Sequence, residues 1–278
     1  MYELTQYIFE DSIENEMKYK GNYGAKGEKR APKKKPTPEQ VAKQNQLNRE
    51  KYLRRVIKAN FAPYDVWACL KYPKGTRKSI GEVMEDVTRF TNRLRNGYKK
   101  AGQPLKWIRR IEIGKQGGVH IHILINRLRG AVETDILIQE LWSHGRVNYE
   151  SLYASGGYAK LAAYIVKQPD EQSVRQLSLL PESEQKEYRK YSTSRNLVRP
   201  RPVRKLYTHW TMRKILQEGP KPTKGFYIDK DSIATGVNAF TGMSWMHYTE
   251  YRLREGKKAD AKSPETAFLL NGKGIFDT

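Results

Sequence analysis

The side chains best suited to chemistry lie in one short run, G-G-V-H-I-H-I-L-I-N, at residues 117–126. Alternate side chains of a β-strand share a face, so His120 and His122 point together and the aliphatic residues between them point the opposite way. The two imidazoles are then about 7 Å apart along the strand, close enough to bind one metal ion. A lone histidine is more often structural, but a pair at this spacing favours a metal site.

Strand register predicts a third ligand. If Lys115-Gln116-Gly117 form a three-residue hairpin loop, Glu112 lies opposite His120 and Arg110 lies opposite His122. Glu112 would then project beside the histidines, and Arg110 could contact a phosphate. A slip of one residue would turn Glu112 away, which leaves open a surface carboxylate paired with a lysine. A mixed nitrogen and oxygen donor set favours Mn²⁺ or Mg²⁺ over a closed structural zinc site.

A second reactive group is predicted on a helix, in the run G-Y-A-K-L-A-A-Y-I-V-K-Q at residues 157–168. The expected buried stripe consists of Tyr158, Leu161, Ala162 and Ile165. Tyr164 lies on the other side with Lys160 and Lys167, at i−4 and i+3. Two ammonium groups favour a phenolate and attract a phosphate, and a phenol with pKa about 10 needs such activation. Taken alone, Tyr164 would be an ordinary half-buried tyrosine; beside the histidine strand it is the predicted nucleophile.

Helices and strands must position these groups, and their predicted order is strand, helix, hairpin, helix, strand, helix. Capping-box patterns at 37–40 and 79–82 predict helix starts. The expected elements are a helix after residue 38, strands at 65–72, 106–113, 119–126 and 146–149, and helices at 79–102, 134–142 and 158–167. A strand-like stretch at 188–195 and a helix near 209–217 are expected further along. The predicted fold class is α+β, a central antiparallel sheet with helices on one face.

Three domains are expected: a basic N-terminal arm and helix at 1–52, a catalytic domain at 53–218, and a small C-terminal appendage at 219–278. The single cysteine, Cys69, excludes an internal disulfide and a cysteine-cage metal site, and it fits a cytoplasmic, reducing compartment. No cleavable signal pattern opens the sequence. No apolar run approaches the roughly 18 residues of a spanning helix, so no membrane partner is expected.

Net charge points to a polyanionic partner. The chain of 278 residues holds 52 lysines and arginines against 30 acidic residues, a formal charge of +22. Such an excess indicates nucleic acid first and an anionic membrane surface second. The candidate DNA-backbone contacts are Lys33, Lys34, Lys35, Arg189, Lys190, Arg199, Arg201 and Arg204. The alternative is that these residues lie in solvated loops.

Several segments together resemble a known family. They are N-F-A-P-Y-D-V-W at 60–67, W-I-R-R-I-E-I-G-K-Q-G-G-V-H-I-H-I-L-I-N at 107–126, L-W-S-H-G-R-V at 141–147 and the tyrosine helix. The histidine strand followed by Y-I-V-K resembles the HUH superfamily of single-strand endonucleases. More narrowly, the ordered set is similar to rolling-circle replication-associated proteins of filamentous phages and bacterial mobile elements, over roughly residues 32–255.

The resemblance implies roles for five residues: His120 and His122 as metal ligands, Glu112 as the third ligand, Tyr164 as nucleophile and Lys167 as its helper. It also implies a product with the DNA 5′ end bound to tyrosine. The chain departs from the family in its first strand, where Cys69-Leu70-Lys71-Tyr72 replaces a threonine-rich segment. Some relatives use two tyrosines on successive turns; Tyr158 and Tyr164 face differently, so one nucleophile is expected.

The expected function is nicking of single-stranded DNA at an origin by metal-dependent transesterification, which starts rolling-circle replication in a bacterial host cell. Lys160 is a second, weaker candidate to stabilise the developing charge. Because no G-x-x-x-x-G-K-[ST] motif occurs, a host helicase and polymerase are the expected partners. The alternatives are a relaxase or single-strand transposase of the same superfamily, or a non-catalytic basic nucleic-acid-binding protein.

Overall fold

The computed structural model describes residues 1–21, 30–114, 117–130, 133–150, 152, 158–167, 171–189, 191–207 and 212–253. The chain divides into two compact units. One combines Met1–Lys33 with Pro202–Thr278, and the other is Lys34–Arg201. Within the described ranges, no helix combines the length and the apolar character needed to cross a membrane.

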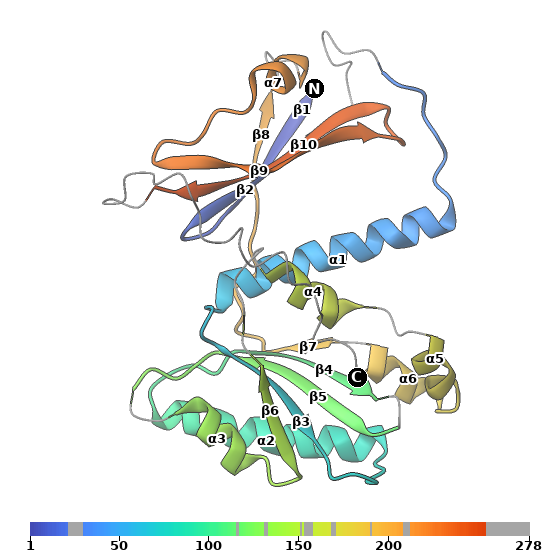
Figure 1. The fold of residues 1–278 in the computed structure, drawn as a ribbon, viewed down its shortest axis with the longest axis vertical. Coiled ribbons are helices and arrows are strands. Elements are labelled where there is room, and N and C mark those ends of the chain that lie inside the picture. The colour runs from blue at the N-terminus through green and yellow to red at the C-terminus, as the bar shows by residue number, and fades with distance from the viewer. Residues whose placement is uncertain are drawn as a thin grey trace, which may run out of the picture. The chain divides into compact units, whose positions relative to one another are not determined.

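Lys34–Arg201 carries the predicted order of elements around one antiparallel sheet (Figure 1). The elements are α1 (Pro38–Asn60), β3 (Val66–Lys71), α2 (Ile80–Lys100), β4 (Trp107–Ile113), β5 (Val119–Ile125), α3 (Thr134–Leu141), β6 (Arg146–Glu150), α4 (Ala159–Val166), α5 (Glu171–Ser178), α6 (Glu182–Arg189) and β7 (Tyr191–Thr193). The strand order is β6-β3-β5-β4-β7. The α+β class with an antiparallel sheet is therefore confirmed.

Both predicted capping boxes are present. The Thr37 hydroxyl accepts from the Gln40 backbone N–H while the Gln40 side chain accepts from the Thr37 N–H. Ser79 and Glu82 form the same reciprocal pair at the start of α2. These side chains satisfy N–H groups that have no partner inside the helix, which fixes where α1 and α2 begin.

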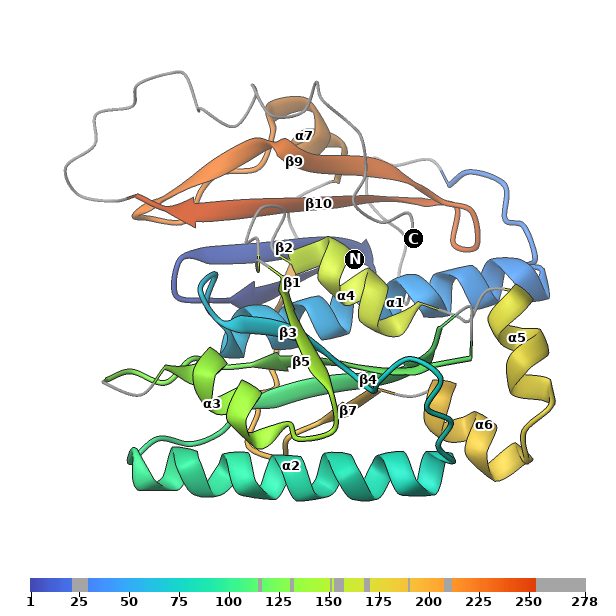
Figure 2. The ribbon, with the colours of Figure 1, turned by 60° about the horizontal axis from the view of Figure 1, so that its bottom comes forward.

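Helices cover both faces of this sheet, not one as expected (Figure 2). On the first face, α2 and α3 pack against the aliphatic side chains of β3, β4 and β5. On the second face, α1 and α4 pack against Trp67, Ile108 and Leu124. The physical reason is that α1 and α4 each carry an apolar stripe, which needs its own partner surface.

The segment between α4 and β7 contains two short helices, α5 and α6, where only a polar stretch was expected. Most of its residues are charged or polar, so the helical apolar period is weak. Two side chains, Leu177 and Tyr188, reach the core under the sheet.

The other unit is a second antiparallel sheet, in the order β8-β1-β2-β10-β9. Its elements are β1 (Tyr2–Ile8), β2 (Ser12–Tyr19), β8 (Val203–Tyr207), α7 (Met212–Glu218), β9 (Phe226–Asn238) and β10 (Met243–Arg252). Tyr2, Leu4 and Met17 pack with Met212 and Met246 in its core.

The expected division at residues 52 and 218 differs from this arrangement. The first residues form strands, not an arm, and β2 pairs with β10 near the other end of the described chain. Asn15 donates to Glu250, 235 residues away, at 2.9 Å. Pairing over such a separation leaves no local signal in the sequence, which is why the two ends were assigned to separate domains. Residues 22–29 of the expected arm and residues 254–278 of the expected appendage lie outside the described residues.

Candidate metal and tyrosine site

The predicted register of the histidine hairpin is confirmed. Glu112 pairs with His120 and Arg110 pairs with His122. The Gly114 N–H donates to the Gly118 carbonyl at 2.8 Å and closes the three-residue loop. Since paired residues share a face, both histidines and both β4 side chains project to the same side of the sheet.

Gly114 lets the His120 ring lie against this hairpin. A Cβ at position 114 would sit 3.1 Å from the His120 Cε1 atom. A side chain here would therefore press on the imidazole, so the glycine supports the position of His120.

A cluster of metal-binding atoms forms across β3 and β5. One ligand atom each from Cys69, His120 and His122 lies within 4.8 Å of the others. The Cys69 sulfur is 3.9 Å from His122 Nε2, and both residues are buried, while His120 is half-buried. Among the residues that the structure describes, these three could hold a metal ion; the predicted third ligand, Glu112, is not in the cluster.

Tyr164 meets the cluster from α4. Its hydroxyl donates to Glu112 Oε2 at 2.9 Å and lies 3.0 Å from His122 Nε2. Its ring makes an edge contact with the His122 ring, with centroids 5.2 Å apart, and with Trp67 at 6.2 Å. The structure thus brings the predicted nucleophile and one predicted ligand into direct contact. Tyr158, in contrast, is buried in the core as expected, and its hydroxyl reaches the Phe61 carbonyl.

The Glu112 carboxylate holds the charged groups of the site together. Its Oε1 lies 3.0 Å from Arg110 Nε and 3.9 Å from Lys167 Nζ, and its Oε2 lies 3.4 Å from His122 Nε2. Burial opposes its ionisation, but His122, Arg110 and Lys167 lower the pKa of Glu112 to about 2. Burial also opposes charge on His122, yet Cys69 and Glu112 raise the pKa of that imidazole to about 9.

The protein groups alone do not favour a Tyr164 phenolate, contrary to the prediction. Burial and the neighbouring Glu112 carboxylate raise the pKa of the Tyr164 hydroxyl. Only one of the two predicted lysines is placed beside it: the Lys167 ammonium lies 4.8 Å from the centre of the Tyr164 ring, whereas Lys160 is exposed to solvent. The physical reason is that the carboxylate is closer to the phenol oxygen than any cation.

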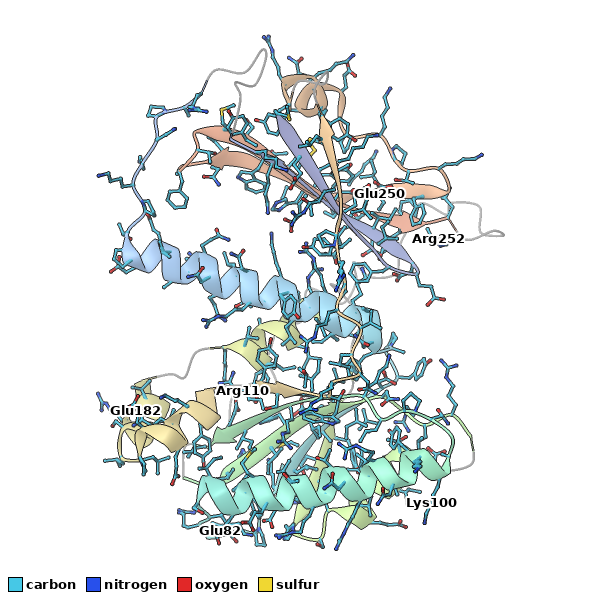
Figure 3. The ribbon with its side chains drawn as sticks, turned by 180° about the vertical axis from the view of Figure 1, so that it is seen from behind. Glu82, Lys100, Arg110, Glu182, Glu250 and Arg252 are labelled. Carbon is cyan, nitrogen blue, oxygen red and sulfur yellow. The ribbon has the colours of Figure 1, made fainter. Side chains whose placement is uncertain are left out.

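Arg110, expected to contact a phosphate, is a structural link to α4 (Figure 3). It is 4% exposed, and its NH1 group donates to the carbonyls of Tyr164, Ile165 and Lys167 at 3.3, 2.7 and 2.8 Å. These carbonyls belong to the last turn of the helix, which lacks internal partners. Arg110 therefore fixes the end of the helix that carries the tyrosine.

The other predicted DNA contacts lie outside this cluster. Lys33, Lys34 and Lys35 are exposed in an extended segment. Arg199 and Arg201 are exposed, and Arg199 donates to the Tyr52 hydroxyl at 2.7 Å.

Arg204 lies in β8, a strand where a loop was expected, and its Nε is 3.9 Å from a Glu3 carboxylate oxygen. Lys190, the side chain of Arg189 and the glycine pair before the tyrosine helix lie outside the described residues.

Two residues of β3 escaped the sequence analysis. Cys69 pairs with His122, and Lys71 pairs with His120 on one side and Arg146 of β6 on the other. Alternation along β3 would have placed Cys69 and Lys71 on one face, but the neighbour of β3 in the sheet was not known from the sequence.

Comparison with known proteins gives one match. Residues 65–169 match the model of a family described as replication-associated proteins of the ORF2 type. No curated protein and no solved structure matches the chain. The predicted resemblance is thus confirmed at the level of a replication-associated family. The matched segment, from β3 through α4, contains every residue of the cluster, and it is this segment that is similar to replication-associated proteins.

Proposed function

We propose that the chain is a replication initiator that nicks single-stranded DNA at an origin, with Tyr164 as nucleophile and a divalent metal ion held at the histidine pair. The observation that carries this proposal is the contact of the Tyr164 hydroxyl with both His122 Nε2, at 3.0 Å, and Glu112 Oε2, at 2.9 Å. The similarity of residues 65–169 to replication-associated proteins supports the same role.

The donor set fits a metal ion. Imidazole nitrogens from His120 and His122 and a sulfur or carboxylate oxygen beside them are ordinary ligands for divalent metals. His122 presents Nε2 to the cluster, and its buried Nδ1 has no hydrogen-bond partner among the described residues. When bound, the metal would supply Lewis-acid polarisation of a phosphate oxygen.

Tyr164 would attack the scissile phosphate in line. The bond between its Oη and phosphorus forms as the bond from phosphorus to the DNA 3′ oxygen breaks. The leaving 3′ oxygen takes a proton from solvent and becomes the free hydroxyl that a polymerase extends. The DNA 5′ end stays bound to the tyrosine, so the phosphoester is conserved and the strand can be rejoined.

Glu112 would accept the phenol proton, because it already accepts the Tyr164 hydrogen bond. Lys167, with its ammonium over the Tyr164 ring, would stabilise the negative charge that grows on the phosphate oxygens. Arg110 would act as a positioning residue, since its bonds to the last carbonyls of α4 hold Tyr164 in place.

A short basic row would bind the DNA backbone next to the cluster. Arg146, Lys71, His120 and Glu112 lie opposite one another across β6, β3, β5 and β4. Arg146 is exposed and Lys71 is partly exposed. Neighbouring strands are about 4.8 Å apart, so Lys71 is well placed to hold a phosphate beside the histidines. Single-stranded DNA is the proposed substrate, and a host helicase and polymerase are the proposed partners.

Covalent capture tests the proposal. The protein is incubated with Mn²⁺ and a library of single-stranded oligonucleotides labelled at the 3′ end, and the denatured products are separated and mapped by mass spectrometry. We expect a labelled adduct on Tyr164 that is absent from Tyr164→Phe. Tyr158→Phe is the matched control, because it removes one hydroxyl from the core end of the same segment and should keep the adduct.

An adduct that persists in Tyr164→Phe, or that maps to another side chain, would overturn the assignment. Failure of the unmodified protein to form any adduct with the library would overturn the endonuclease activity itself.

A further inference from the structure

We propose that Cys69, and not Glu112, is the third protein ligand of the metal, so that the site binds a thiophilic divalent ion such as Zn²⁺ or Co²⁺ in preference to Mg²⁺. This inference deepens the proposed function and rests on it, because it concerns the same cluster. It changes the predicted nitrogen and oxygen site into one with sulfur.

The position of Cys69 in β3 is the first argument. β3 lies directly beside β5, and Cys69 is paired with His122, so its side chain projects on the histidine face. Its sulfur is 3.9 Å from His122 Nε2. The three candidate ligand atoms of Cys69, His120 and His122 all lie within 4.8 Å of one another, which is the spacing expected around one shared ion.

The contacts of Glu112 are the second argument. One carboxylate oxygen accepts the Tyr164 hydroxyl, and the other faces Arg110 at 3.0 Å and Lys167 at 3.9 Å. These contacts link β4 to the helix that carries the nucleophile. Ligation by Glu112 would compete with them, whereas ligation by Cys69 leaves them intact and keeps the carboxylate available to the phenol.

The chemistry of sulfur decides the metal. Cysteine binds metals as a thiolate, so binding releases the Cys69 proton to solvent. Thiolate and imidazole suit zinc and its softer neighbours, while Mg²⁺ requires oxygen ligands. Two histidines and one cysteine also leave a fourth position open, as catalytic zinc sites do.

Cobalt spectroscopy tests the ligand directly, because Cys69 is the only cysteine in the chain. Tag-free protein is titrated with Co²⁺ in the absence of DNA, and the absorption in the near ultraviolet is recorded together with the amount of bound metal. We expect a thiolate-to-cobalt charge-transfer band that saturates at one Co²⁺ per chain. Cys69→Ser should lose the band and bind Co²⁺ at least about tenfold more weakly, since even groups that only support a ligand contribute 10–100-fold to affinity.

Glu112→Gln is the matched variant, and it should keep both the band and the affinity within a few-fold. Thermal unfolding of each variant shows whether the fold is intact; Cys69→Ala serves in place of the serine variant if the latter does not fold. Bound Co²⁺ without the band, or a serine variant that binds as tightly as the original protein, would overturn the assignment.

The two proposals fail separately. If the band appears but no oligonucleotide is captured on Tyr164, the cysteine ligand stands and the nicking activity is overturned. If Tyr164 is captured in Mn²⁺ while Co²⁺ binds without a band, the nicking activity stands and the cysteine ligand is overturned.

Discussion

The two faces of the sheet in Lys34–Arg201 are built from the same strands and differ in almost every property. The side that faces α2 carries Val66, Ala68, Leu70, Ile111, Val119, Ile121, Ile123 and Ile125, all buried. The side that faces α4 carries Trp67, Cys69, Lys71, Arg110, Glu112, His120 and His122. Neighbouring residues of one strand therefore belong to an aliphatic core and to a charged cluster.

This difference shows how the fold separates stability from chemistry. The period of two in a strand sends adjacent side chains to opposite faces, so substitutions one residue apart should have opposite consequences. Burial of the aliphatic face holds the sheet together. The clustered face instead keeps a carboxylate, two imidazoles and a phenol in contact, an arrangement that costs desolvation of charged groups.

The largest effect is expected for His120→Ala. Loss of one of two imidazole ligands should lower the rate of adduct formation by about 10³-fold or more, because the loss of groups that only support a ligand already costs 10–100-fold. Since His120 is half-buried and far less packed than its neighbours, the free energy of unfolding should change by less than about 1 kcal/mol. Single-turnover adduct kinetics and urea unfolding measure the two quantities.

The control for His120→Ala is its metal dependence. The residual activity should no longer respond to metal concentration as the unmodified protein does. A variant with unchanged rate and unchanged response to metal would remove His120 from the site.

Ile121→Ala reverses the pattern at the next residue. Ile121 is fully buried on the α2 face, and deleting its side chain should cost about 2–5 kcal/mol of unfolding free energy. Under conditions where the variant is folded, adduct formation should stay within a few-fold of normal. Urea denaturation gives the first quantity; a large loss of activity in the folded variant would contradict the separation of the two faces.

Much of this sheet could be predicted from local pattern. The capping residues Thr37 and Ser79 gave the starts of two helices, and the histidine hairpin, read with a three-residue loop, gave the pairing of Glu112 with His120. Each of these depends on residues a few positions apart, where propensity and register act directly.

What could not be predicted depends on long-range pairing. Nothing in the sequence around Cys69 says that its strand lies beside the histidine strand, and so the sulfur was not considered as a ligand. Arg110 was placed on the correct face, but its partners are carbonyls of α4, which only tertiary structure brings there. In the same way, the pairing of β2 with β10 joins the two ends of the described chain in one sheet.

A smaller effect is expected for a buried charge on the α2 side, Asp86. It is 1% exposed and contacts Lys78 and Arg89, each at 2.5 Å, and the Tyr72 hydroxyl at 3.0 Å. His144 Nε2 lies 3.4 Å from the same carboxylate. Burial opposes ionisation, but the hydrogen bonds from Lys78, Tyr72 and Arg89 keep the pKa of Asp86 below its usual range.

A lowered pKa in the folded state means that the ionised Asp86 adds stability above the unfolded pKa, about 4. That stability is lost as the pH falls through the folded pKa. Asp86→Asn should therefore cost roughly 1–2 kcal/mol at neutral pH and progressively less below about pH 4. Urea unfolding between pH 3 and pH 7 measures the difference; a cost that does not change with pH would show that Asp86 acts through shape and not through charge.

The smallest effect is expected for Lys71→Ala, which tests whether the clustered face extends along the basic row to DNA. Lys71 is partly exposed and opposite His120, and we expect it to contact one phosphate. Its loss should weaken binding of single-stranded DNA by a few-fold and reduce the slope of log K against log salt by about 0.7, the value for one phosphate contact. Lys100→Ala is the matched control, since it removes the same charge from the exposed end of α2 (Figure 3). Equal changes in slope for the two variants would mean that overall charge, and not the row beside the histidines, determines where DNA binds.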